Sequence, residues 1–246
     1  MMKNNERRLS KNKKAISLLS TGLDSPVATY LIAQQGIEVV GVYFDNHPFI
    51  ASTRNGKKRQ EELPKANRWK DIKAIAQTLV NKFTHQKLFD LFIVPHGENL
   101  GGIIRQASDP KVTCVLCKRL MLKKTVALAN TIGTTFLVTG DILGEQASQT
   151  IENLRIISEV IPEMTVIRPN IGLNKLEVIT IAREIGTYQH AAQAAKKVCT
   201  AVPKKPVTRT TSDRIEAAEA RVPIKEWVKE SIMNAVKLPF QQETRE

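Results

Sequence analysis

The sequence predicts an α/β fold in which helices cover both faces of a doubly wound, Rossmann-like parallel sheet. Short β-rich runs alternate with helical stretches along the chain, which is the pattern of strand–helix–strand units. A turn of small residues joins the first run to the first helical stretch, where sheets of this class bind ligands. The chain has 246 residues, of which 42% are hydrophobic, and this is enough for one core of that kind.

The predicted strands are short runs rich in β-branched and other apolar residues. They are expected at residues 15–19, 37–43, 88–94, 135–138 and 164–167. Helices are expected at residues 26–33, 67–83, 117–130 and 175–185, with a closing amphipathic helix at 215–236 that is interrupted near Pro223. Pro26 suits a first helical turn, because its missing N–H has no partner there in any case. Residues 195–213 are interpreted as an ordered loop or a partner-binding arm, since they are rich in Lys, Pro and Thr.

We therefore expect a basic N-terminal segment at residues 1–14, one α/β domain at 15–214, and a C-terminal helix and tail at 215–246. Lys and Arg number 37 against 24 Asp and Glu, so the net charge is +13. This charge predicts a polyanionic partner, with nucleic acid before an anionic membrane, although a basic protein can also simply be soluble. No run approaches the roughly 18 apolar residues that cross a bilayer, and we expect a cytoplasmic protein.

The three cysteines point to metal, redox or nucleophile chemistry. An odd number in a chain of this size is not a disulfide scaffold. Cys114 and Cys117 form a Cys-x-x-Cys pair, and Cys199 follows far downstream. The pair lies at the predicted start of a helix, where the helix N-terminus lowers a thiol pKa.

The turn after the first predicted strand is a candidate phosphate-binding loop. Its residues are Ser20, Thr21, Gly22, Leu23, Asp24 and Ser25. Small residues let the backbone approach an anion, and the first N–H groups of the following helix point at it. Asp24 would repel a phosphate unless Mg²⁺ lay between them. An ordinary turn with Asp24 as a helix cap fits the spacing equally well.

The motif Ser-x-Gly-x-Asp-Ser resembles the PP-loop of the ATP pyrophosphatases, although Thr21 stands where these enzymes usually have glycine. Further motifs in the same order resemble the catalytic domain of ThiI-type tRNA 4-thiouridine synthetases. These motifs lie at residues 19–28, 44–49, 117–121, 138–154, 168–175, 181–188 and 199–208. The resemblance covers roughly residues 15–210. It implies a PP-loop fold of the adenine nucleotide alpha hydrolase type, with ATP and Mg²⁺ as cofactors.

The implied reaction has two halves. ATP adenylates a uridine carbonyl in tRNA and releases pyrophosphate, and sulfur then displaces AMP to give 4-thiouridine. Asp24 and Asp141 would hold Mg²⁺, while Lys118 or Arg119 would neutralise charge that builds on the phosphates. Nucleotide binding is expected at Ser20, Thr21, Gly22, Leu23, Asp24, Ser25, Tyr43, Phe44, Asp45, Thr139, Gly140 and Gln146. Gly140 would give the nucleotide backbone room, and Gln146 would read a polar edge.

Simpler interpretations of the same residues stay open. Asp141 could be only a helix cap, and Lys118 and Arg119 could be a solvated pair on a helix face. The cysteines have three interpretations. Cys114, Cys117 and Cys199 bind a [4Fe–4S] cluster with one iron open for sulfide, which resembles archaeal ThiI-like enzymes. Alternatively, Cys199 carries a persulfide that Cys117 resolves as a disulfide, or all three are small buried hydrophobes.

The implied partners are tRNA and a sulfide or persulfide donor. Basic residues crowd residues 3–14, 54–59 and 196–209, and the last two clusters would flank the site around a flipped-out base. ThiI-type enzymes usually carry an N-terminal ferredoxin-like and THUMP module, and the sequence begins almost at the PP-loop motif, so we do not expect that module in this chain. We therefore expect RNA to be held by the basic surface or by a separate THUMP-type subunit, and we also consider a homodimer.

Two other functions remain open at this point. A PP-loop sulfurtransferase could act on 2-thiouridine or 2-thiocytidine positions, or on a small metabolite, with persulfide chemistry at Cys199. A protein of another class, which binds RNA or nucleotides without catalysis, could use the same fold. Thr21 would then indicate a PP-loop that has lost its catalytic role.

Overall fold

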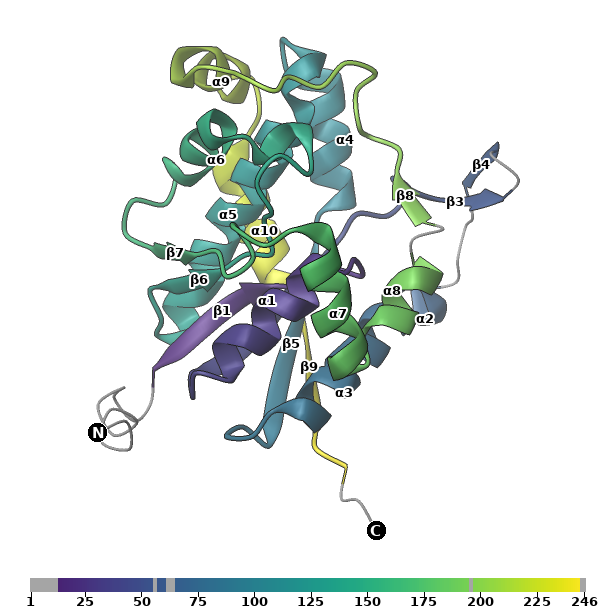
Figure 1. The fold of residues 1–246 in the computed structure, drawn as a ribbon. Coiled ribbons are helices and arrows are strands. Elements are labelled where there is room, and N and C mark those ends of the chain that lie inside the picture. Colours follow the sequence, from purple (N-terminus) through teal and green to yellow (C-terminus); the bar gives the residue numbers. More distant parts are fainter. Residues whose placement is uncertain (1–12, 55–56, 61–64, 195–196, 244–246) are drawn as a thin grey trace.

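The protein is described by a computed structural model that covers residues 13–54, 57–60, 65–194 and 197–243. Among these residues, six strands form the main sheet (Figure 1). Their order is β7 (Thr165–Ile167), β6 (Phe136–Val138), β1 (Lys14–Leu18), β2 (Glu38–Asp45), β5 (Leu88–Pro95) and β9 (Val236–Gln241). All neighbours are parallel except β9, which runs antiparallel to β5.

The strand order confirms the predicted doubly wound sheet. From β1 the chain adds β2 and then β5 on one side, and it returns to the other side of β1 for β6 and β7. The order therefore reverses between β1 and β6. The carboxyl ends of those two strands border the crevice in which sheets of this class bind ligands.

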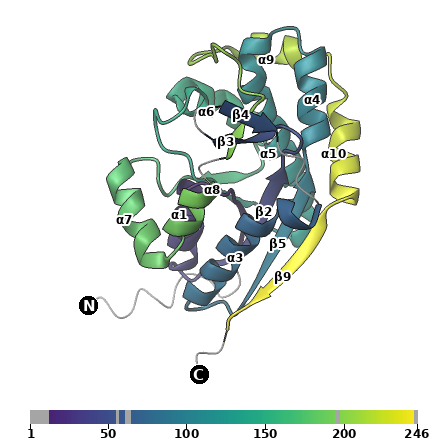
Figure 2. The same ribbon diagram turned by 90° about the vertical axis from the view of Figure 1, so that its right-hand side faces the viewer.

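Helices cover both faces of the sheet (Figure 2). One face carries α1 (Asp24–Ala33), α3 (Lys70–Lys82) and α7 (Lys175–Ile185). The other carries α4 (Gly97–Gln106), α5 (Thr113–Ile132), α6 (Ile151–Ser158), α9 (Ser212–Glu219) and α10 (Ile224–Met233). Ala15 and Ile16 of β1 are both fully buried, one in each core. Successive residues of a strand point to opposite faces of the sheet, so a central strand that is covered on both faces buries side chains on both of them.

A second, three-stranded antiparallel sheet stands beside the main one (Figure 1). It consists of β4 (Lys57–Gln60), β3 (Ile50–Arg54) and β8 (Lys197–Cys199). Cys199 pairs with Ile50 across the β8–β3 ladder. The expected loop at 195–213 therefore contains a strand. Hydrophobic patterning did not predict this sheet, because its strands are short and mostly polar.

Shorter helices complete the connections between these elements. They are α2 (Lys65–Arg68), α8 (Tyr188–Ala194) and the 3₁₀ turns η1 (Pro110–Val112) and η2 (Ala147–Gln149). Helix α4, which was also not predicted, contains three glycines that lower its helix propensity. Packing decides in its favour, since a Cβ on Gly97 would lie 1.7 Å from the His47 carbonyl oxygen.

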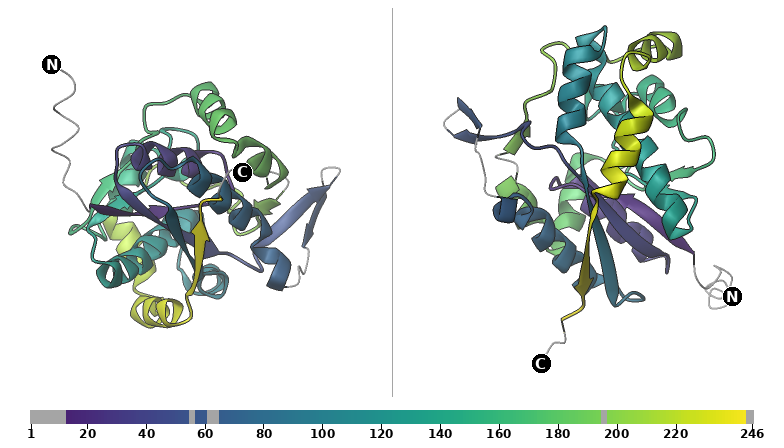
Figure 3. Two further views of the ribbon diagram at one scale, coloured as in Figure 1. Left: turned by 90° about the horizontal axis from the view of Figure 1, so that it is seen from below. Right: turned by 180° about the vertical axis from the view of Figure 1, so that it is seen from behind.

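The predicted closing helix at 215–236 is interrupted near Pro223, as expected, and consists of α9 and α10, while the strand β9, which was not predicted, begins at Val236. Pro223 directly precedes α10, and the chain then continues into β9 along the sheet edge (Figure 3). In β9, Leu238 pairs with Leu91 of β5, and Pro239 stands opposite Asp90. An edge strand tolerates proline, because on one side it has no neighbouring strand that needs a backbone N–H donor. Within the described ranges, no helix combines the length and apolar character needed to cross a membrane.

Candidate active site

Hydrogen bonds close the predicted PP-loop between β1 and α1. The Ser25 hydroxyl accepts from the Ser20 backbone N–H at 2.7 Å and lies 2.8 Å from the Ser20 hydroxyl. The Gly22 N–H donates to the Ser20 hydroxyl at 3.2 Å. These bonds hold the turn against the first residues of α1. The helix N-terminus therefore faces the carboxyl edge of the sheet, where it favours an anion.

The turn after β6 packs directly on this loop. A Cβ on Gly140 would lie 2.6 Å from the backbone nitrogen of Ser25 and 2.8 Å from the carbonyl carbon of Asp24. We predicted that Gly140 would give a nucleotide room. The structure corrects this, because the space belongs to the protein's own PP-loop backbone. Thr139 is buried beside it.

The PP-loop forms one wall of a cavity of about 580 Å³. The predicted nucleotide-binding residues that line it are Thr21, Gly22, Leu23, Asp24 and Gln146. The other lining residues are Glu145, Lys175, Tyr188, Lys197 and alanines of α8. Lys197 is two residues before Cys199 on β8. The short strand therefore connects the cavity wall to a cysteine.

Lys175, which the sequence analysis did not single out, bridges two carboxylates of this cavity. Its ammonium lies 3.1 Å from Asp24 Oδ1 and 2.9 Å from Glu145 Oε1. Partial burial disfavours the charge on Lys175, but the hydrogen bonds to Glu145 and Asp24 outweigh it and raise the pKa. Asn174 caps α7 by accepting from two backbone N–H groups, which fixes the helix start that carries Lys175. A lysine directly after a cap at the sheet edge is the sequence signal that could have found it.

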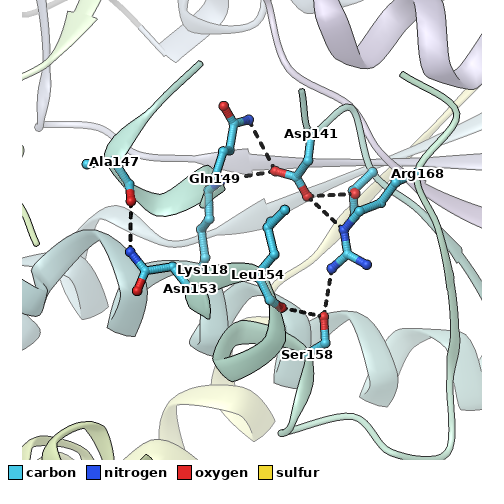
Figure 4. A network of polar contacts seen from close by, with 9 residues as sticks. Lys118, Asp141, Ala147, Gln149, Asn153, Leu154, Ser158 and Arg168 are labelled. Carbon is cyan, nitrogen blue, oxygen red and sulfur yellow. Dashed lines mark hydrogen bonds and ion pairs between the residues drawn. The ribbon is translucent and has the colours of Figure 1, made fainter. Parts of the chain in front are cut away.

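Asp141, which follows β6, is the centre of a partly buried polar network (Figure 4). Its Oδ1 accepts from Lys118 Nζ at 3.1 Å and from Gln149 Nε2 at 3.2 Å. Its Oδ2 accepts from Thr139 Oγ1 at 2.8 Å and lies 3.4 Å from Arg168 Nε. Burial alone would raise the pKa of Asp141, but the Lys118 charge and these hydrogen bonds lower it. The Asp141 carboxylate therefore holds the Lys118 and Arg168 side chains near the point where the strand order reverses.

The two carboxylates predicted to hold Mg²⁺ thus differ in their surroundings. Both oxygens of Asp141 already have protein partners, so the geometry gives it a structural task instead. Asp24 and Glu145 line the cavity, and each forms an ion pair with the Lys175 ammonium. One or two carboxylates beside substrate phosphates are the protein ligands that Mg²⁺ usually takes. These two residues therefore fit the ion by donor type and position.

Arg119 does not face the site, contrary to the prediction. Its guanidinium donates to both oxygens of Glu219, at 2.8 and 3.0 Å, and to the Ile156 carbonyl at 2.6 Å. Only 4% of Arg119 is exposed. Successive residues of an α-helix point about 100° apart, so Lys118 reaches Asp141 while Arg119 binds α9 and α6. Arg119 is part of the packing between helices.

The last residues of β2 do not line this cavity. Tyr43 packs in the core below α1 and α3, and burial raises the pKa of its hydroxyl. Phe44 packs in the opposite core, edge-on to His96 with ring centres 5.5 Å apart. Asp45 accepts hydrogen bonds from His47 Nδ1 at 2.8 Å and from Trp69 Nε1 at 3.0 Å. None of the predicted residues 43–45 is among the described residues that line the 580 Å³ cavity.

The three cysteines come together from two segments. Cys114 and Cys117 lie in the first two turns of α5, which begins earlier than predicted, and Cys199 ends β8. Burial raises the pKa of Cys114 and of Cys117, and charge on Cys199 adds to both shifts. We predicted lowered thiol pKa values from the helix N-terminus. Desolvation outweighs that effect here, because these side chains face the protein interior.

Cysteine thiols are the donor type that iron–sulfur clusters take. Within the described part of the chain, no three His, Cys, Asp or Glu side chains form a group that could hold one metal ion. An iron–sulfur cluster places its cysteine sulfurs farther apart, because each cysteine binds a different iron. Three thiols near one another fit that donor type.

Comparisons with known proteins identify the family. The model of the family described as "Thiamine biosynthesis protein (ThiI)" matches residues 10–224. A probable tRNA sulfurtransferase of Methanosarcina mazei is 35% identical over 224 residues, which cover 90% of this chain and 50% of that protein. A probable tRNA sulfurtransferase of Thermus thermophilus is 37% identical over 214 residues, which cover 87% of this chain and 48% of that protein. The chain thus spans about half the length of these relatives.

Solved structures agree with the sequence relatives. A 4-thiouridine synthetase in complex with RNA and with bound ATP superposes with a TM-score of 0.81 at 27% identity, over 93% of this chain and 55% of that chain. An NMN synthetase from Francisella tularensis, at 13% identity and a TM-score of 0.50 over 89% of this chain and 84% of that chain, is similar in fold alone. The family match over residues 10–224 confirms the resemblance predicted from the motifs. The chain belongs to the ThiI family.

Proposed function

We propose that this chain is the ATP-dependent catalytic part of a tRNA sulfurtransferase that makes 4-thiouridine. One observation carries the proposal: β8 joins the PP-loop cavity, through Lys197, to the cysteine site at Cys199. Helix α5 also joins a cysteine to the turn that packs on the PP-loop, since Lys118, one residue after Cys117, reaches Asp141. Nucleotide activation and sulfur delivery would therefore occur next to each other.

In the first half-reaction, a uridine carbonyl oxygen attacks the α-phosphate of ATP and pyrophosphate leaves. The PP-loop residues 20–25 would bind the leaving pyrophosphate through backbone N–H and hydroxyl groups. Lys175 stays charged through neutral pH because its pKa is raised, so it would neutralise phosphate charge. Asp24 and Glu145 would hold Mg²⁺, which supplies further charge neutralisation when bound. Lys118 and Arg168 would add positive charge from the Asp141 network.

In the second half-reaction, sulfur replaces AMP on the activated carbon. We propose that Cys114, Cys117 and Cys199 hold a [4Fe–4S] cluster, which would offer an iron site for sulfide when bound. Cysteine thiolates are the usual ligands of such clusters, and coordination deprotonates the thiol. The alternative is a persulfide on Cys199 that Cys117 resolves as a disulfide.

The proposed substrate is tRNA, in keeping with the net charge of +13 and with the names of the relatives. The predicted basic cluster at residues 3–14 lies largely outside the described residues. The sulfide or persulfide donor, a separate THUMP-type subunit, a homodimer and a cytoplasmic location stay predictions.

The activity is tested by incubating the protein with labelled ATP, Mg²⁺, sulfide and an unmodified tRNA transcript under anaerobic conditions. The expected result is AMP and pyrophosphate in equal amounts, dependent on tRNA, with 4-thiouridine in the digested product. Formation of 2-thiouridine would correct the position but keep the sulfurtransferase. ATP binding without release of AMP, with or without tRNA, would favour the non-catalytic alternative.

The cofactor is tested separately by anaerobic purification followed by iron and acid-labile sulfide assays. About four irons and four sulfides per chain are expected, and single Cys→Ala variants at 114, 117 or 199 should lose them. Protein that stays colourless after reconstitution with iron and sulfide would favour persulfide chemistry at Cys199.

A further inference from the structure

A chain of buried polar side chains leads from the Cys117 sulfur into the protein interior. His96 Nε2 lies 3.2 Å from Cys117 Sγ, and Lys124 Nζ lies 3.1 Å from His96 Nδ1. His96 is 1% exposed and Lys124 is 0% exposed. Cys117 and Lys124 are seven residues apart on α5, so they face the same side of the helix and meet His96 at the end of β5.

Lys124 has an acceptor for each of its three N–H groups. Besides His96 Nδ1, the ammonium donates to the Pro95 carbonyl at 2.9 Å and to Asn99 Oδ1 at 2.7 Å. The Ser231 hydroxyl of α10 is 3.1 Å from the same Asn99 oxygen. A buried ammonium is costly unless its donors are satisfied and a negative charge is near. The donors are satisfied here, and the Cys117 sulfur and the Glu230 carboxylate of α10 are the two groups whose negative charge acts on Lys124.

The contacts determine which nitrogen of His96 carries the proton. An ammonium has no lone pair, so His96 Nδ1 must accept from Lys124. With the Lys124 ammonium 3.1 Å from Nδ1, that nitrogen keeps its lone pair and the ring carries one proton. The single ring proton is therefore on Nε2. That N–H points at Cys117 Sγ, and the sulfur accepts a hydrogen bond.

Negative charge on the Cys117 sulfur and positive charge on the Lys124 ammonium stabilise each other. Burial lowers the pKa of Lys124 to about 7, while negative charge on Cys117 and on Glu230 opposes this shift. A sulfur that is negative, whether as a thiolate, a persulfide or a cluster ligand, thus keeps Lys124 protonated. The protonated Lys124 in turn fixes the His96 tautomer that donates to the sulfur.

We propose that His96 and Lys124 are positioning residues for the Cys117 sulfur: Lys124 fixes the Nε2–H tautomer of His96, and His96 donates a hydrogen bond that stabilises negative charge on that sulfur. The proposal rests on the proposed function only in giving Cys117 a part in sulfur transfer. It distinguishes Cys117 from Cys114, which lies one turn earlier on the same helix. Hydrogen bonds to cysteine sulfurs tune both cluster potentials and thiolate reactivity.

The test measures the sulfur directly and uses no tRNA. Metal-free, reduced protein is treated with iodoacetamide under anaerobic conditions, and the alkylation rate of each cysteine is followed by mass spectrometry. His96→Phe and Lys124→Met should each slow alkylation of Cys117 about tenfold, as expected for loss of one hydrogen bond to a charged group. Cys114 is the internal reference and should react at an unchanged rate. His96→Gln can keep an N–H donor at the same reach and should restore most of the rate.

Equal slowing at Cys114 and Cys117, or no slowing at either, would overturn the proposal. Circular dichroism and thermal melting identify variants that fail to fold. For that case, the ¹⁵N and ¹³C NMR shifts of His96 in the wild-type protein provide an independent measurement. A neutral Nε2–H tautomer is expected, and an Nδ1–H tautomer would contradict the proposal. Failure of tRNA thiolation with these results intact would count against the proposed function alone.

Discussion

Lys175 is the cation that the cavity wall directs toward the PP-loop. It bridges Asp24 and Glu145, and its raised pKa keeps it charged at neutral pH. Because Lys175 follows the cap of α7, its position depends on a rigid helix start rather than on a long loop. A charge fixed in this way can stabilise phosphate oxygens without reorganising.

Lys175→Met should lower kcat/KM for tRNA-dependent AMP formation by about a hundredfold, since one preorganised charge is lost from the transition state. Steady-state kinetics with labelled ATP measures this. Lys225→Met, which removes an exposed lysine on α10, is the matched control and should leave the rate unchanged. Similar losses in both variants would mean that net charge, not the position of Lys175, matters.

Lys118 and Arg119 are neighbours in the chain with opposite tasks. Arg119→Met should destabilise the fold by about 3–5 kcal/mol, because it leaves the Glu219 carboxylate largely buried with one fewer partner. Lys118→Met should lower AMP formation and destabilise the fold less than Arg119→Met, because Arg168, Thr139 and Gln149 still contact Asp141. Thermal unfolding and kinetics on the two variants separate these outcomes. An unchanged melting temperature in Arg119→Met would contradict the assigned packing role.

The ion pair between Arg119 and Glu219 predicts that the stability of the fold depends on pH. Burial opposes the charge on Glu219, but Arg119 and Lys123 lower its pKa below the usual value of 4.5. A lowered carboxyl pKa stabilises the fold above the unfolded value, and this contribution is lost as the pH falls through the folded value. Denaturant unfolding between pH 7 and pH 3 should therefore show a smaller acid loss in Arg119→Met than in wild type. Parallel curves would contradict the assignment.

At the scale of elements, the PP-loop depends on the turn after β6. Gly140→Ala should destabilise the protein and weaken ATP binding, since a Cβ would lie 2.6 Å from the Ser25 backbone and no side chain can move to relieve it. Gly172→Ala is the matched control, because its Cβ would meet nothing within 4 Å. Calorimetric ATP titration and thermal melting measure both effects. Equal stability and ATP affinity in the two variants would show that the PP-loop does not depend on close packing against the turn after β6.

For the whole molecule, the net charge of +13 predicts binding of tRNA that depends strongly on salt. If about four phosphates are neutralised, the affinity should fall by about a hundredfold between 50 and 200 mM monovalent salt. Filter binding or fluorescence anisotropy at several salt concentrations measures the slope. An affinity that is independent of salt would show that phosphate contacts contribute little to the complex.

Local sequence patterns predicted the buried parallel strands, the capped helices and the PP-loop, because apolar periodicity and turn residues act over a few positions. They did not predict β9, whose pairing with β5 joins segments almost 150 residues apart. Nor did they predict α4, where close packing of glycines on His47 and Trp227 outweighs low helix propensity. Such elements form because distant surfaces bury them, and no short window of sequence contains both surfaces.

The sequence by itself determined the doubly wound fold, the ThiI resemblance and the residues of the PP-loop. The tertiary structure alone decided what each side chain faces. It turned Arg119 toward Glu219, placed the PP-loop backbone against Gly140, and brought Lys175 to the carboxylates of the cavity. It also placed His96 and Lys124 behind Cys117. The physical reason is that burial, charge and hydrogen bonding depend on distances in space, which separation along the chain does not specify.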